Sequence, residues 1–152
     1  MNTKEKNFSN VLKKYLLEQG VLVDKIESRV TTAGVPDLLL SMKSHCDCHA
    51  ELKIIEAEGP KAGKLHLTPG QISWHAKRVL HGKCYPFICC VEKYNTMLII
   101  SSRKALEIVK AGGKVDLESI PASCFFTRNR EGYIALIDTA ICNFYSSQRV
   151  YK

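Results

Sequence analysis

The feature that most restricts the fold of this chain is a set of short apolar runs that contain no charged residue. They lie at Leu38–Leu40, Phe87–Val91 and Met97–Ile100. Runs of this length are typical of strands, and a strand without polar positions is one whose two faces are both covered. None approaches the roughly 18 to 20 apolar residues that a membrane-spanning helix needs. The runs therefore predict a central sheet that carries helices on both faces.

Helical patterns flank these runs. Apolar residues recur three and four positions apart at Phe8, Val11, Leu12, Tyr15 and Leu16. This spacing predicts an amphipathic helix that ends before Gly20. A second helix opens at Thr68-Pro69-Gly70-Gln71, because Thr and Gln have capping-box spacing and Pro takes the first helical position. A third helix is capped by Ser102 and reaches Ala111.

Two further strands and a hairpin complete the order of elements. The strands are expected at residues 21–28 and 51–57, and the hairpin joins Phe125–Thr127 to Tyr133–Asp138. The order helix, three strands, helix, two strands, helix, hairpin describes one mixed α/β domain. We expect a single domain over residues 1–152, with a core at about 8–111 and a C-terminal extension at about 112–152.

Charge and cysteine content narrow the class of protein. Twenty-two Lys and Arg residues against fifteen Asp and Glu give a net charge of +7 at pH 7, which favours a polyanionic partner. Seven cysteines, an odd number with Cys89 and Cys90 adjacent in an apolar run, argue against a disulfide framework. The first residues lack the apolar segment of a secretory signal. We therefore expect an intracellular, cytoplasmic nucleic-acid protein.

The stretch from Asp37 to Lys53 points to metal chemistry. Glu51 and Lys53 are two positions apart on an expected strand, so their side chains share one face, opposite Leu52. Asp37 opens the preceding strand, after a turn that can hold its side chain toward a cleft. Two converging carboxylates and a backbone carbonyl form a hard oxygen site suited to Mg²⁺, and without a cation their repulsion raises the pKa of one acid. The alternative is a structural Glu51–Lys53 pair on an exposed strand and an unrelated turn aspartate.

These residues carry a resemblance to a known superfamily. Pro36-Asp37, followed by Glu51-Leu52-Lys53, resembles the signature of the PD-(D/E)XK nucleases. The helix that starts at Thr68 and includes Gln71, Trp74 and His75 is similar to the glutamine-containing helix of the virus-type replication-repair (VRR-NUC) and Holliday junction resolvase-like members. The resemblance covers about residues 8–92 and implies a restriction-endonuclease-like core, with a mixed sheet in the order helix-β-β-β-helix-β.

The resemblance also implies roles for individual residues. Asp37 and Glu51 would bind Mg²⁺ or Mn²⁺, with the carbonyl of Leu52 as a third ligand, and Lys53 would help to activate the attacking water. Gln71 either caps its helix or contacts the water or phosphate, and these roles are compatible. The family often adds a glutamate from the first helix, for which Glu18 is the candidate; the alternative for Glu18 is a solvated charge near a helix end.

Basic residues are expected to surround this site and to hold a phosphate backbone without reading its bases. They are Lys13, Lys14, Lys61, Lys64, Lys77 and Arg78. Each alone could be an ordinary surface charge. Together with the resemblance they predict a metal-dependent DNA endonuclease of a bacterial or phage-infected cell, with branched or junction DNA among its substrates. A homodimer could form through the C-terminal hairpin.

The same sequence features also agree with other functions and residue roles. A non-catalytic nucleic-acid-binding protein with a nuclease-like fold, and an RNA-directed nuclease of the same superfamily, are the alternative functions. His75 could contact phosphate or donate a proton, although a half-buried, hydrogen-bonded imidazole is commoner. The run His45-Cys46-Asp47-Cys48-His49 is too crowded to close on one zinc ion and is better read as a polar loop.

Overall fold

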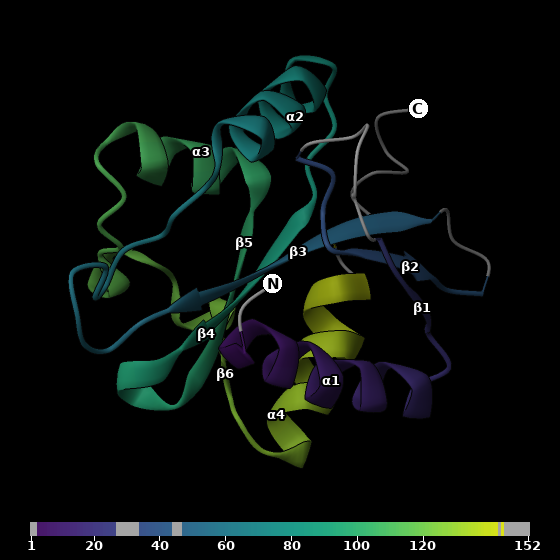
Figure 1. Ribbon diagram of the computed structural model, residues 1–152. Coiled ribbons are helices and arrows are strands. Elements are labelled where there is room, and N and C mark those ends of the chain that lie inside the picture. The colour runs from purple at the N-terminus through teal and green to yellow at the C-terminus, as the bar shows by residue number, and fades with distance from the viewer. Residues whose placement is uncertain (1–2, 27–33, 44–46, 143, 145–152) are drawn as a thin grey trace.

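The computed structural model describes residues 3–26, 34–43, 47–142 and 144. The helices are α1 (Thr3–Glu18), α2 (Pro69–Leu80), α3 (Ser102–Lys110) and α4 (Arg130–Ala135). The strands are β1 (Leu22–Lys25), β2 (Leu38–Ser41), β3 (Cys48–Ile55), β4 (Pro86–Val91), β5 (Thr96–Ser101) and β6 (Phe125–Thr127). The strands form one mixed sheet, with α1 and α4 on one face and α2 and α3 on the other (Figure 1). The expected α/β class, a mixed sheet flanked by helices, is confirmed.

The sheet places β3 between an antiparallel and a parallel neighbour. The strand order is β1-β2-β3-β4-β5-β6, and β3 runs parallel to β4 because α2 crosses over between them. Strand β2 begins with Leu38 opposite Ala50, whereas β4 pairs with Glu51 through Ile55. Strand β2 therefore pairs with the N-terminal part of β3 and β4 with its C-terminal part, and the pairing partner changes at Glu51.

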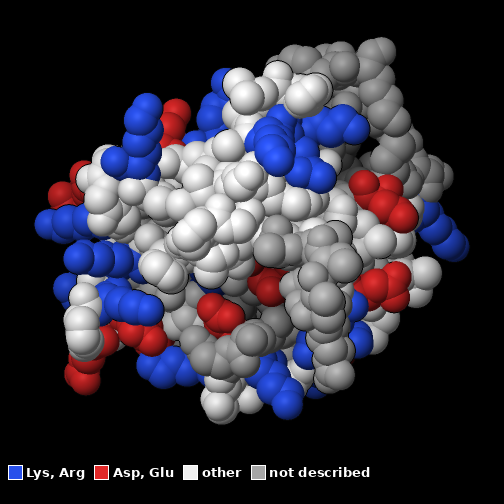
Figure 2. Space-filling view, turned by 45° about the horizontal axis from the view of Figure 1, so that its top comes forward, with Lys and Arg blue, Asp and Glu red and all other residues white. Residues whose placement is uncertain are grey.

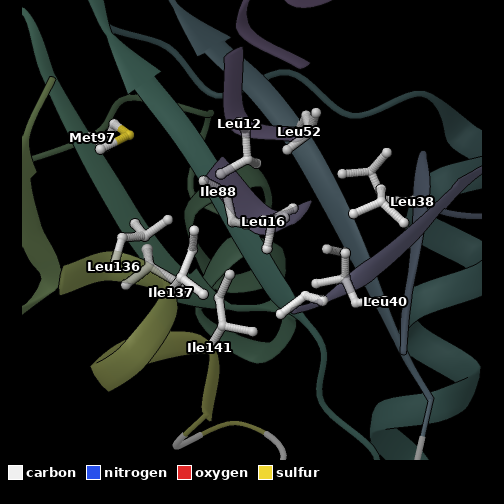
Figure 3. Packing of buried hydrophobic residues seen from close by; sticks show 14 of the residues in the cluster. Leu12, Leu16, Leu38, Leu40, Leu52, Ile88, Met97, Leu136, Ile137 and Ile141 are labelled. Carbon is white, nitrogen blue, oxygen red and sulfur yellow. The ribbon is translucent and has the colours of Figure 1, made fainter. Parts of the chain in front are cut away.

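Two apolar clusters fill the space on either side of the sheet. The larger one lies under α1 and α4, where Leu12 and Leu16 pack toward the sheet (Figure 3). The second lies under α3 and holds Phe87, Val91 and Ala105. Such burial of apolar surface on both faces contributes about 25 cal/mol per Å² removed from water. This double coverage explains the uninterrupted apolar runs of β4 and β5. In β2 the expectation holds for one face only, because Leu38 and Leu40 are buried in the larger cluster while Leu39 is half-buried and belongs to neither cluster.

The cysteines of β4 are part of this core. Cys89 and Cys90 are 0% and 2% exposed, and neither forms a disulfide. Burial raises the pKa of the Cys89 thiol to about 12, so the reactive thiolate is suppressed. Both residues act as small apolar side chains.

The C-terminal hairpin is not present. Phe125–Thr127 does form a strand, but it pairs with β5, and the chain then turns into α4. The Asn129 side chain caps α4 by accepting a hydrogen bond from the N–H of Gly132 at 2.8 Å. A π-helical turn, Leu136–Ile141, continues α4. The prediction of a second strand at residues 133–138 is wrong, so the hairpin through which a homodimer could have formed is not present.

Smaller differences concern the ends of elements. Ser101 rather than Ser102 caps α3, since its hydroxyl accepts from the N–H of Lys104 at 3.2 Å. The first strand is shorter than residues 21–28, and residues 27 and 28 lie outside the described part of the chain, as do His45 and Cys46. Within the described residues, no helix has the length and apolar character to cross a bilayer.

Candidate active site

Asp37 lies directly before β2 and opposite the middle of β3. Because Leu38 pairs with Ala50 in an antiparallel register, the next pair along brings Asp37 opposite Glu51. The Oδ2 atom of Asp37 accepts a hydrogen bond from the backbone N–H of Leu52 at 3.0 Å. The Asp37 carbonyl accepts from the N–H of Ile26 at 2.9 Å. The carboxylate is thus anchored at the point where the pairing of β2 with β3 ends.

Glu51 and Lys53 project from the same face of β3, as the strand alternation predicts. Glu51 is 0% exposed and Lys53 is 9% exposed. Their side chains approach to 4.0 Å between Lys53 Nζ and Glu51 Oε1. Leu52, between them, belongs to the apolar cluster on the opposite face. The alternative of a pair on an exposed strand is therefore wrong, because both side chains are covered.

Gln71 links these charged groups to α2. Its Nε2 donates to Glu51 Oε1 at 3.0 Å, and its Oε1 accepts from Lys53 Nζ at 2.9 Å. The same Oε1 accepts from the N–H of Thr68 at 3.0 Å, which completes the predicted capping box. Gln71 therefore both caps its helix and contacts the acid and the lysine.

The environment of Glu51 disfavours its charged form. Burial raises the pKa of the Glu51 carboxyl far above its ordinary value, and the nearby Asp37 carboxylate raises it further. Lys53 opposes this shift. Burial and the second acid therefore both favour the protonated form of Glu51.

His75 lies one turn beyond Gln71 and is completely buried. Its Nε2 is 3.7 Å from Glu51 Oε2. Burial, with Arg78 nearby, lowers the pKa of His75 to about 4, so the imidazole is neutral at ordinary pH. Because the ring is 0% exposed, it is unavailable for direct contact with a phosphate in this arrangement.

The glutamate that α1 brings toward the site is Glu5. Burial raises the pKa of Glu5, and Lys53 and Asp37 both act on it electrostatically. Glu18 lies thirteen residues further along the helix, about 20 Å away at 1.5 Å per residue. Its carboxylate instead pairs with Arg130 at 2.8 Å. The prediction that Glu18 lies beside Asp37 and Glu51 is therefore wrong, and the glutamate of α1 that does lie near Lys53 is Glu5, which precedes the apolar residues that revealed the helix.

The predicted ring of cations is divided between the two faces of the sheet. Lys61 and Lys64 line a cavity of about 130 Å³ together with Lys53, Glu5 and His66. Lys13 and Lys14 lie in the middle of α1, which covers the opposite face from Glu51 and Lys53. His66, which sequence reasoning missed, adds an ionisable group to this cavity.

The two cations of α2 differ in their surroundings. Lys77 is exposed, whereas the Arg78 guanidinium lies 3.6 Å from the centre of the Trp74 ring and donates to the Trp74 carbonyl at 3.0 Å.

Figure 2 shows Lys and Arg in separate groups on this face of the molecule, with acidic side chains among them. The basic charge is thus distributed in patches, and the patch nearest the acids is that of Lys53, Lys61 and Lys64.

The donor set suits a hard divalent cation. Asp37 and Glu51 supply carboxylates, and the Leu52 carbonyl points to the same strand edge as the Leu52 N–H, toward Asp37. The Glu51 Oε2 atom is buried and has no hydrogen-bond partner in the described structure. No three His, Cys, Asp or Glu side chains among the described residues are grouped to hold an ion. Mg²⁺ needs only one or two carboxylates and completes its shell with water, so these residues fit it.

Comparison with solved structures gives a structural likeness. No protein-family model and no curated protein sequence matches this chain. The structure is similar to that of Hjc, a Holliday junction resolvase from the archaeal hyperthermophile Archaeoglobus fulgidus, with a TM-score of 0.47 and 13% sequence identity. The similarity covers 64% of this chain and 77% of the archaeal one.

Proposed function

We propose that this protein is a metal-dependent nuclease that hydrolyses internal phosphodiester bonds in DNA. The observation that supports this function best is the buried Glu51 carboxylate, which lies beside Asp37 and is linked through Gln71 to Lys53. The proposal includes Mg²⁺ or Mn²⁺ as the cofactor and Asp37, Glu51 and the Leu52 carbonyl as its ligands.

The energetics of the site favour a functional over a structural origin. Burying an acid and a lysine costs free energy that their mutual attraction only partly returns, and apolar residues of similar size would stabilise such a position better. A raised pKa caused by burial and by a second acid, next to a cavity, is typical of functional sites. The buried Glu51 carboxyl therefore lowers the stability of the metal-free protein, and a bound cation would stabilise its ionised form.

Each residue has a defined part in this proposal. A bound divalent ion would supply a Lewis acid that neutralises phosphate charge and acidifies water. Asp37 is fixed by the Leu52 N–H, so its free oxygen has a set direction. Gln71 holds Lys53 Nζ at 2.9 Å, which keeps the ammonium beside the acids where it can stabilise negative charge on a phosphate oxygen.

The substrate class follows from the cations next to the acids. Lys61 and Lys64 share a cavity with Lys53, so a phosphate backbone could bind across them without sequence readout. The net charge of +7 favours such a polyanion. The proposal includes branched or junction DNA among the substrates. It also includes a homodimer, because two copies of a small single-site domain could together cut both strands of such a substrate.

The test is a panel of labelled substrates. Linear, nicked, flapped and four-way DNA, with a matched RNA duplex, are incubated with the protein in Mg²⁺, Mn²⁺ or EDTA, and Glu51→Gln is the matched control. The proposal predicts DNA cleavage that EDTA and Glu51→Gln both abolish. Salt-sensitive binding without cleavage would identify a non-catalytic binder, and cleavage of RNA alone would identify an RNA nuclease; either result overturns the proposal.

A further inference from the structure

Helix α2 presents two polar side chains to the same carboxylate. Gln71 and His75 are four residues apart, so they lie on one face of the helix, one turn from each other. Gln71 Nε2 donates to Glu51 Oε1 at 3.0 Å, while His75 Nε2 lies 3.7 Å from Glu51 Oε2. The two oxygens of Glu51 are therefore each approached by a different residue of α2.

The packing around His75 does not explain its polarity. The ring lies among aromatic side chains, with its centroid 4.7 Å from that of Phe87 and 5.0 Å from that of Trp74. An apolar residue would fill such a site without leaving polar atoms unpaired. Both ring nitrogens of His75 and the Oε2 of Glu51 are buried without a hydrogen-bond partner in the described structure.

These orphaned atoms complement one another. A neutral imidazole carries one N–H donor, and an ionised carboxylate is an acceptor at both oxygens. A movement of less than about 1 Å would bring Nε2 and Oε2 within the ordinary hydrogen-bond distance of about 2.9 Å. Burial makes this pairing favourable, because an unpaired polar atom away from water is costly.

We propose that His75 is a positioning residue for Glu51: in the cation-bound protein, where Glu51 is ionised, it donates its Nε2–H to Oε2 of the carboxylate and, with Gln71 on the other oxygen, fixes the plane of the metal-binding group. This inference rests on the proposed function, since it assigns His75 to the support of that same site. Groups that orient a metal ligand from behind change metal affinity by about 10- to 100-fold when they are removed. His75 acts through Glu51 and does not contact the ion.

The experiment is an NMR titration of the full chain with Mg²⁺ alone. Long-range ¹H–¹⁵N spectra of the Mg²⁺-saturated protein identify which nitrogen of His75 carries the proton, and the shifts during titration give the dissociation constant. We expect the Nε2–H form, a tenfold or greater loss of Mg²⁺ affinity in His75→Leu, and recovery to within about threefold in His75→Gln, whose amide can reach the same oxygen.

The outcomes separate this inference from the function on which it rests. A proton on Nδ1 in the Mg²⁺-bound protein, or unchanged affinity in a folded His75→Leu variant, overturns the role of His75 and leaves the metal site intact. Unchanged affinity in Asp37→Asn overturns the proposed metal site. If the wild-type chain binds no Mg²⁺, both are overturned. The spectra of the wild-type protein decide the question even if His75→Leu does not fold.

Discussion

Gly34 lies so close to the first turn of α2 that a methyl group on residue 34 would overlap the carbonyl oxygen of Gly70. Gly34 also has a φ of +94°, which side-chain-bearing residues rarely adopt. Three residues later the same segment reaches Asp37, and Gly70 is followed by Gln71. The contact between the two glycine backbones therefore limits how closely this segment approaches α2, the helix whose Gln71 side chain contacts Glu51 and Lys53.

Replacing Gly34 by Ala should disturb the site as well as the fold. The turn must move away from α2, so we expect a loss of about 2–4 kcal/mol in unfolding free energy, from steric overlap and the positive φ together. Urea denaturation measures it. Gly59→Ala is the matched control, since Gly59 has a φ of +97° with nothing within 4 Å of its would-be Cβ. Equal losses in the two variants would show that the close contact is unimportant.

Glu51→Gln should stabilise the metal-free protein increasingly as the pH rises. Burial raises the folded-state pKa of Glu51 above its ordinary value of 4.5, so above pH 4.5 the unfolded chain loses this proton while the folded chain retains it. Each pH unit in this window removes up to about 1.4 kcal/mol of wild-type stability. Urea unfolding in EDTA at pH 5 and pH 8 tests this. A difference between the two proteins that is equal at both pH values would contradict it.

Lys53→Met should separate metal binding from catalysis. The substitution keeps the apolar stem and removes the ammonium that Gln71 holds at 2.9 Å. Cleavage should slow by about 100-fold or more, as expected for the loss of one charged group that stabilises a transition state. Calorimetry should show that Mn²⁺ still binds at least as tightly as in the wild type, because a competing cation has been removed. Cleavage at the wild-type rate would exclude Lys53 from the mechanism.

Two glutamates of α1 provide a paired comparison. Glu5→Gln should weaken Mn²⁺ binding about threefold to tenfold, since a nearby charge contributes on the order of 1 kcal/mol. Glu18→Gln should leave Mn²⁺ binding unchanged and lower stability by less than about 1 kcal/mol, because its ion pair with Arg130 is largely exposed. Calorimetric titration of both variants decides between them. A larger loss of Mn²⁺ affinity in Glu18→Gln than in Glu5→Gln would show that Glu18, and not Glu5, belongs to the metal site.

The β3 segment shows how far local patterns can predict a site. Strand alternation alone places Glu51 and Lys53 on one face and Leu52 on the other, and the capping spacing of Thr68 and Gln71 locates the start of α2. These are short-range properties of the backbone. That α2 folds back so that Gln71 reaches Glu51 is a tertiary contact between residues twenty positions apart, which periodicity does not contain.

The C-terminal segment shows where the prediction failed and which signal was available. Arg128 to Gly132 resembles a turn between two strands, but Asn129 caps a helix instead. Tyr133, Leu136, Ile137 and Ile141 are all buried, and their spacing of three, four and eight positions is helical. Glu5 was overlooked for a different reason, since it precedes the apolar stripe and only the direction of α1 across the sheet brings it near Lys53.

The most direct test of the central claim is cleavage of labelled DNA by wild-type protein and by Asp37→Asn, side by side in Mg²⁺ and in EDTA. Asparagine can still accept the hydrogen bond from the Leu52 N–H, so this variant removes the charge while preserving the local structure. We predict cutting by the wild type in Mg²⁺ alone and a rate at least about 1,000-fold lower in the variant. Cutting by Asp37→Asn at the wild-type rate, or wild-type cutting that EDTA leaves unchanged, would contradict the account.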